Sequence, residues 1–262
     1  MKDTAHLLRL YDEQLRTEAE TAGAMSVARL GPLRLATFEG GRGFITYPYL
    51  GDPDADAVDR LVPEALDHYR SDPAIVEVEW KTRGHDPAPG LHEALVRNGF
   101  LPGDPESVMV GEISALVADV PLPTGVTLRR VTEEQDVRAM SAMSSEVFGD
   151  AAAREMADGL LRRLRLGTDL ELWVAEADGR MIGAGRLEPV ADSDFAGLWG
   201  GAVRKPWRGR GIYRALTAAR ARAALAGGRT LVHSDSTEYS RPILERSGLV
   251  KVSTTTPYLW RR

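Results

Sequence analysis

The segment at residues 203–216, VRKPWRGRGIYRAL, constrains the fold more than any other part of the sequence. It connects a predicted strand over residues 195–203 to a predicted helix over residues 212–226. The first amides of a helix have no partners within it, and together with the helix dipole they form a site for phosphate. Gly209 and Gly211 allow a ligand to approach the backbone closely, because they carry no side chain. We therefore expect a strand–turn–helix unit that binds a polyphosphate.

The basic side chains of this segment indicate the same kind of ligand. Five of them fall within eleven residues, namely Arg204, Lys205, Arg208, Arg210 and Arg214. Arg208, Arg210 and also Arg204 can pair with phosphate oxygens in a forked geometry. Two common phosphate motifs are excluded. A Walker loop needs Gly-Lys followed by Ser or Thr, and a dinucleotide fingerprint needs Gly where position 214 holds Arg.

Hydrophobic periodicity and turn residues predict a mixture of helices and strands in the first half of the chain. The expected elements are a helix over residues 3–20, strands over 26–30, 33–38 and 43–49, a helix over 54–70, a strand over 74–80, a helix over 90–98 and a strand over 107–113. Gly40-Gly41-Arg42-Gly43 is superficially similar to the basic segment. It precedes a strand instead of a helix, so we predict a hairpin turn there.

The segment SALVADVPLPTG at residues 114–125 continues no helical or strand period, and it carries two prolines and a glycine. We place the domain boundary there, with domains over residues 1–115 and 126–262 and a linker over 116–125. The second domain is predicted to contain strands over 126–130, 170–176, 180–188, 195–203, 230–234 and 250–260, and helices over 133–147, 151–166, 212–226 and 241–246. Asp178-Gly179 predicts a tight hairpin, and Thr132 with Gln135 predicts a capping box.

Composition excludes several classes of function. The chain has no cysteine, so disulfides, thiolate zinc sites and cysteine nucleophiles are absent, and a cytoplasmic location is expected. A net charge of −5 gives no support for nucleic-acid binding. No stretch reaches the roughly 18 apolar residues of a membrane span, and the N-terminus lacks the apolar core of a signal peptide. Proline and glycine interrupt the segment of His85 and His92, so no metal site is expected.

Residues 208–213, Arg-Gly-Arg-Gly-Ile-Tyr, resemble the pyrophosphate-binding motif of the GNAT acyltransferases, Arg/Gln-x-x-Gly-x-Gly/Ala. The resemblance implies acetyl-CoA as co-substrate, with its pyrophosphate on the loop amides and its pantetheine arm on the preceding strand. It extends to residues 240–249, SRPILERSGL, which are similar to the family's helix beside the cofactor. The implied cofactor-binding residues are Ala202, Val203, Arg208, Gly209, Arg210, Gly211, Ile212, Tyr213 and Ser240.

The resemblance covers residues 126–262 in motif and element order, and the two halves echo each other. LHEALVRNGF in the first half corresponds to RPILERSGL in the second, which suggests an internal duplication. The first half resembles a degenerate GNAT-like domain without the cofactor motif. The implied fold is α+β with α/β/α layering: tandem GNAT-like folds, each with a mixed, mostly antiparallel central sheet flanked by helices.

Two positions depart from the family pattern. Tyr213 stands where Gly or Ala is usual, so its side chain must point away from the phosphates. Leu244 stands where many members carry a tyrosine that protonates the departing thiolate. The usual general acid is therefore missing from its usual place, and Tyr239 is the candidate to replace it.

A general base must come from elsewhere, because residues 198–203 contain no carboxylate. His233 and Asp235 are two apart on or after a strand, so their side chains can share a face, and the histidine pKa suits proton transfer at neutral pH. The competing interpretation is a histidine that is hydrogen-bonded to its neighbours. Glu188 and Glu238 are weaker candidates, and Trp199 either lines an acceptor pocket or fills the core.

These observations predict an N-acetyltransferase that moves an acetyl group from acetyl-CoA directly to a primary amine of an unidentified acceptor. The alternatives are a non-catalytic acyl-CoA binding or sensing protein and a polyanion-binding module that uses the arginine cluster alone. The expected partners are acetyl-CoA and an amine-bearing acceptor, with no nucleic acid and no membrane. The expected oligomeric state is a monomer or a homodimer.

Overall fold

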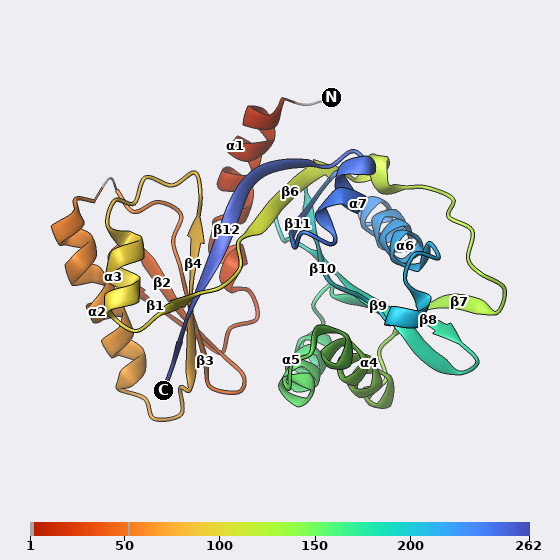
Figure 1. Ribbon diagram of the computed structural model, residues 1–262, viewed down its shortest axis with the longest axis horizontal. Coiled ribbons are helices and arrows are strands. Elements are labelled where there is room, and N and C mark those ends of the chain that lie inside the picture. The colour runs from red at the N-terminus through yellow and green to blue at the C-terminus, as the bar shows by residue number, and fades with distance from the viewer. Residues whose placement is uncertain (1–2, 52) are drawn as a thin grey trace. The chain divides into compact units, whose positions relative to one another are not determined.

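The computed structural model describes residues 3–51 and 53–262 and divides the chain into two compact units (Figure 1). The first unit contains the chain up to residue 108 together with residues 235–238 and 251–262, and the second contains residues 109–234 and 239–250. The last residues of the chain therefore complete the unit that begins with its first residues. The assignment of a separate domain to each half, with a linker at 116–125, stays a prediction.

The first unit is built on a sheet in the order β1-β2-β3-β4-β12. Its strands are β1 (Ser26–Leu30), β2 (Leu33–Phe38), β3 (Arg42–Thr46), β4 (Glu77–Arg83), the short β5 (Leu101–Pro102) and β12 (Val250–Arg261). Its helices are α1 (Thr4–Leu15), the 3-10 helix η1 (Glu18–Thr21), α2 (Ala55–Arg70) and α3 (Leu91–Arg97). β3 and β4 run parallel, because α2 connects them as a crossover. The core of this unit is centred on Trp80, Tyr69 and Phe100.

The second unit has the sheet order β6-β11-β10-β9-β8-β7. The strands are β6 (Glu106–Glu112), β7 (Val126–Val131), β8 (Glu171–Ala177), β9 (Arg180–Pro189), β10 (Phe195–Val203) and β11 (Leu231–Ser236). The helices are the 3-10 helix η2 (Ile113–Leu116), α4 (Glu134–Phe148), α5 (Ala153–Arg165), the 3-10 helix η3 (Lys205–Trp207), α6 (Ile212–Ala226) and α7 (Arg241–Arg246). β10 and β11 are the parallel pair here, joined by the crossover helix α6.

Helices cover both faces of the second sheet, with α4 and α5 on one side and α6 on the other (Figure 1). Leu160 and Leu161 of α5 pack with Leu172 and Val174 of β8, whereas Leu216 of α6 packs with Ala175 on the opposite face of the same strand. This arrangement confirms the predicted α/β/α layering and the mixed, mostly antiparallel sheets. Within the described residues, no helix combines the length and apolarity needed to cross a bilayer.

Most predicted elements agree with the structure to within a few residues, and the differences have local causes. The predicted strand at 74–80 begins only at Glu77, because the Asp72 carboxylate accepts a hydrogen bond from the Ala74 amide at 2.9 Å and holds a turn there. The predicted capping box of Thr132 is wrong: Glu133 is the N-cap of α4 and makes no side-chain capping bond. The Asp178-Gly179 hairpin is confirmed, with φ of 49° and 71° at its two central residues.

The two units end corresponding helices in the same way. After α3 the Phe100 amide donates to the Leu95 carbonyl at 3.0 Å, and after α7 the Leu249 amide donates to the Leu244 carbonyl at 3.1 Å. Gly99 and Gly248 allow these bonds by adopting φ of 87° and 96°. The shared crossover and the shared helix ending support the predicted duplication.

A glycine exchange tests this helix ending. We expect Gly248→Ala to lower the free energy of unfolding by about 1 kcal/mol, because alanine is strained at positive φ. Its Cβ would also lie 3.2 Å from that of Ala115. Gly159→Ala in α5 is the control, since no atom lies within 4 Å of its added Cβ, and it should raise stability by ~0.5–1 kcal/mol. Urea unfolding of both variants measures the two effects. Equal free energies of unfolding for Gly248→Ala and Gly159→Ala would contradict the assigned role of Gly248 in ending α7.

Candidate functional site

The turn between β10 and α6 depends on two glycines. β10 ends at Val203, η3 follows, and the backbone is extended at Arg208 before α6 begins at Ile212. Gly209 and Gly211 have φ of 74° and 82°, a region that side chains with a Cβ rarely adopt. The predicted strand–turn–helix unit is therefore present.

The amides at the start of α6 face no protein acceptor. Gly211 is the N-cap, no side chain caps the helix, and its first turn carries no acidic residue. Within the described residues, the amides of Gly209, Arg210 and Gly211 donate to no carbonyl or side-chain oxygen. The crossover helix α2 of the first unit differs, because the Asp54 carboxylate accepts from the Ala57 amide at 2.7 Å. Only the second unit thus presents an uncapped crossover helix, which is a suitable site for an anion.

The arginines around this turn have different neighbours. Arg208 donates from Nε to the Val203 carbonyl at 3.0 Å, and the Arg210 guanidinium lies 5.1 Å from the centre of the Trp207 ring. Arg204 is held by Glu146 of α4 and donates from Nε to the Met181 carbonyl at 3.0 Å. Arg208 and Arg210 therefore remain suitable for a phosphate, whereas Arg204 is occupied by an ion pair.

Backbone pairing between the two central strands stops beside this turn, although Ser234 Oγ still donates to the Leu198 carbonyl at 2.9 Å. Parallel pairing between β10 and β11 ends at Gly197↔His233, although β10 continues to Val203. On its other edge β10 stays paired with β9, and Ala202 and Val203 lie opposite Ala184 and Gly183. The register shifts between Trp199 and Ala202, so Gly200 and Gly201 form a bulge. The edge of β10 that β11 no longer covers includes this bulge and the two predicted pantetheine-binding residues.

Tyr213 fills the space between α6 and the start of α7. Its ring lies over Gly201, where an added Cβ would be 2.6 Å from Tyr213 Cε2, and its hydroxyl is hydrogen-bonded to Ser240. Burial raises the pKa of this phenol, while the Arg220 charge and Ser240 lower it by less. Leu244, the residue at the usual place of the general acid, is buried in the core.

His233 lies in a row of three residues that cross the sheet. Glu188 of β9 is opposite Gly197 of β10, which is opposite His233 of β11, so all three point to the α5 face. The imidazole makes edge contacts with the rings of Phe195 and Trp199 at centroid distances of 6.0 and 5.1 Å. Gly197 creates this space, since a Cβ there would lie 3.1 Å from His233 Nε2 and 2.3 Å from Trp199 Nε1.

Glu188 brings a negative charge to this row. Its carboxylate lies 3.0 Å from Arg163 and 3.4 Å from Arg186. Burial alone would raise the pKa of Glu188, but the two guanidiniums, with a smaller contribution from His233, hold it below its ordinary value. Glu188 is therefore ionised at neutral pH. Its charge interacts with His233, although the two residues are far apart in the sequence.

The other two predicted catalytic residues lie in different surroundings. Asp235 belongs to the first unit, where its carboxylate accepts from Lys81 Nζ at 2.6 Å. Burial would lower the pKa of Lys81, but Asp235 raises it above its ordinary value, so Lys81 is charged at neutral pH. Tyr239, in the second unit, is 91% exposed. The catalytic roles of His233, Asp235 and Tyr239 stay predictions.

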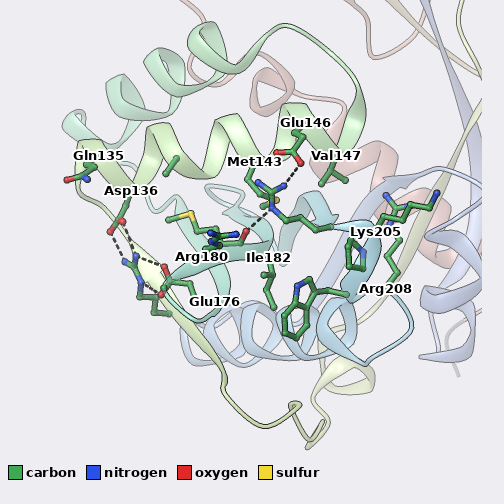
Figure 2. A pocket seen from close by; sticks show the side chains of 17 residues that line it. Gln135, Asp136, Met143, Glu146, Val147, Glu176, Arg180, Ile182, Lys205 and Arg208 are labelled. Atoms are coloured by element: carbon green, nitrogen blue, oxygen red, sulfur yellow. Dashed lines mark hydrogen bonds and ion pairs between the residues drawn. The ribbon is translucent and has the colours of Figure 1, made fainter.

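A cavity of about 910 Å³ lies on the α4 side of the turn (Figure 2). Met143 and Glu146 of α4, Arg180 and Ile182 of β9, and Lys205 and Arg208 of the turn contribute to its lining. Its lining does not include Gly209, Gly211 or Ile212, so it is adjacent to the uncapped helix start instead of part of it. The described residues contain no group of three or more His, Cys, Asp or Glu side chains that could hold a metal ion.

Comparisons with known proteins agree with this geometry. Residues 137–248 match the model of the Acetyltransferase (GNAT) family. A GCN5-related N-acetyltransferase from Kribbella flavida has a similar fold, with a TM-score of 0.65 and 17% identity over 93% of this chain and 94% of that one. A tandem GNAT protein from the clavulanic acid biosynthesis pathway also has a similar fold. Its TM-score is 0.62 and its sequence identity is 16%, over 98% of this chain and 95% of that one. No curated protein matches the sequence.

The ion pairs of Glu188 give a pH-dependent prediction. Glu188→Gln should lower the free energy of unfolding at pH 7 by about 1–2 kcal/mol, because Arg163 and Arg186 lose a largely buried anion. The depressed pKa adds stability above the ordinary value of 4.5, and this contribution is lost as pH falls through the folded-state pKa. Urea unfolding should therefore show that the difference in the free energy of unfolding between wild type and Glu188→Gln becomes smaller as the pH falls below 4.5. A difference that grows on acidification would contradict the depressed pKa of Glu188.

Proposed function

We propose that this protein, whose residues 137–248 match the model of the Acetyltransferase (GNAT) family, is an acetyltransferase of that family and transfers an acetyl group from acetyl-CoA to a primary amine. The observation that carries the proposal is the uncapped start of α6, with two glycines at positive φ and arginines at positions 208 and 210. A diphosphate satisfies these amides and is attracted by the helix dipole. The fold position is also suitable, because the turn follows the carboxyl end of a central parallel strand.

The remaining cofactor contacts follow from this anchor. The amides from Gly209 to Tyr213 and the side chains of Arg208 and Arg210 would hold the diphosphate. The pantetheine arm would then lie along the edge of β10 at Ala202 and Val203, which β11 leaves uncovered. Ser240, at the start of α7, would border the arm on its other side.

Direct transfer requires one bond to form and one to break. The neutral amine nitrogen attacks the thioester carbonyl carbon, and the carbonyl electron pair moves to oxygen as the C–N bond forms. When this intermediate collapses the C–S bond breaks and the CoA thiolate leaves with the electron pair. The nitrogen must lose a proton to a base, and the thiolate gains one from an acid or from water. His233 is the candidate base and Tyr239 is the candidate acid. Asp235, in the same strand as His233, is an alternative base.

A second function, acyl-CoA binding without catalysis, is favoured by one observation. Leu244 is buried in the core where a tyrosine would protonate the thiolate, and Tyr239 lies in solvent. The proposal of an N-acetyltransferase also includes three further points. The acceptor carries a primary amine, the protein is cytoplasmic, and it is a monomer or a homodimer.

Cofactor binding is tested with a matched pair of substitutions. Acetyl-CoA should raise the thermal midpoint of the wild type, because a ligand that binds only the folded state stabilises it. Gly211→Asp should abolish this rise, since it places a carboxylate against the diphosphate. Gly211→Asn is the control, because asparagine has the same shape and tolerates positive φ but carries no charge. Equal stabilisation of the aspartate variant and the wild type would overturn the assignment of this turn.

Turnover is tested by the release of free CoA in the presence of a broad panel of amines. His233→Gln should lower kcat by about 10²-fold while leaving KM for acetyl-CoA nearly unchanged, as expected for loss of a general base. It should also remove from the pH profile of kcat/KM the acidic limb, which is the loss of activity that protonation of the base produces. Tyr239→Phe tests the acid in the same assay. Binding of acetyl-CoA without CoA release from any amine would favour the non-catalytic alternative.

A further inference from the structure

Arg220 of α6 is a buried cation with an unusual set of partners. Its side chain is 1% exposed, and within the described part of the chain it forms no ion pair with a carboxylate. Nε donates to the Leu216 carbonyl at 3.1 Å, and Nη2 lies 3.4 Å from Thr217 Oγ1. Nη1 donates to the carbonyls of Arg186 and Trp199 at 3.0 and 3.3 Å. The guanidinium is thus satisfied by neutral oxygens while its charge is not balanced.

The sheet is shaped to admit this side chain. Gly185 of β9 lies directly under the guanidinium, and a Cβ there would be 2.6 Å from Arg220 Cζ. A buried unbalanced charge is costly, and an apolar residue of similar size is usually the more stable solution. Burial lowers the pKa of Arg220 to about 10, so the group is still charged at neutral pH. The position therefore holds a permanent positive charge close behind β10.

The carbonyl that Arg220 contacts belongs to the peptide at the start of the β10 bulge. That peptide joins Trp199 to Gly200, and Gly200 has no register partner in β9. In a trans peptide the N–H points away from the C=O, so the Gly200 amide points away from the guanidinium. A hydrogen bond to the carbonyl strengthens the N–H of the same peptide as a donor. Arg220 and the bulge together create positive potential where β10 and β11 separate.

We infer that Arg220 is a positioning residue that polarises the Trp199–Gly200 peptide and stabilises the negative charge that develops on the acyl carbonyl oxygen during transfer. This inference rests on the proposed function. It concerns only the electron pair that moves to the carbonyl oxygen as the C–N bond forms and returns as the C–S bond breaks. Arg220 exchanges no proton and touches no substrate atom in this scheme.

The experiment compares three variants of α6 in full-length protein. Arg220→Met removes the charge and keeps the length of the side chain, Arg220→Lys keeps the charge, and Arg222→Met removes an exposed arginine that donates to the Ala118 carbonyl. We expect Arg220→Met to lower kcat by about 10²–10³-fold with KM for acetyl-CoA changed less than threefold. Arg220→Lys should recover at least a tenth of wild-type kcat, and Arg222→Met should match the wild type.

A spectroscopic measurement separates this role from a purely structural one. The infrared carbonyl stretch of bound acetyl-CoA, labelled with carbon-13 at the thioester carbon, should move to lower frequency in the wild type than in free acetyl-CoA. The shift should persist in the lysine variant and vanish in the methionine variant. An unshifted carbonyl in wild type that binds acetyl-CoA, or equal shifts in wild type and Arg220→Met, would overturn the inference.

The outcomes also separate the inference from the proposed function. Failure of the wild type to bind acetyl-CoA in the thermal assay overturns the proposed function and the inference with it. Binding without turnover overturns acyl transfer and, with it, the stabilisation of charge during transfer; the carbonyl frequency then tests only whether Arg220 polarises the bound acyl group. Equal loss of kcat in the lysine and methionine variants, with an unchanged carbonyl frequency, would assign Arg220 a structural role and overturn the inference.

Discussion

The separation of β10 from β11 beyond Gly197↔His233 is the constraint on which the functional half of this structure depends. Two parallel strands joined by one crossover helix place the start of that helix next to the carboxyl end of the first strand. Because pairing stops before β10 ends, the same strand has a backbone edge that is not paired with β11 and that leads to the uncapped amides of α6. A long ligand with an anionic group at one end and a polar chain behind it suits this combination.

Both units have a crossover helix between two parallel strands, but they differ at the residue that begins this helix. In the first unit Asp54 supplies its own carboxylate to the helix start, so a protein oxygen occupies the place that a phosphate would need. In the second unit Gly211 supplies none, and the chain around it is basic instead of acidic. The cap and the charge around it therefore distinguish the two crossover helices, and only the second is free of a side-chain cap within the described residues. The same helix ending after α3 and α7 is a second feature that the two units share.

The sequence predicted the local elements well, because their signals are local. The strand at 195–203, the helix at 212–226 and the helix at 241–246 agree with the observed bounds, and each is delimited by glycine or by a change of periodicity. Signals that depend on distant neighbours were weaker. Glu188 is only a weaker candidate base in the sequence, although register places it opposite Gly197 and beside Arg163. Arg220 was not singled out, since along α6 it resembles the exposed Arg214 and Arg222.

Three glycines of β9 and β10 explain why the site could not be derived from its polar residues alone. Gly185 makes room for the Arg220 guanidinium, Gly197 for the Trp199 and His233 rings, and Gly201 for the Tyr213 ring. In sequence each is an ordinary glycine inside a strand, where it costs stability and offers no side chain to pack. In the folded sheet each creates space for polar or aromatic side chains, on the α6 face for Gly185 and Gly201 and on the α5 face for Gly197. The sheet thus separates a cation on one face from the His233–Glu188 row on the other, and an acyl group between the strands would meet positive potential and a base from opposite sides.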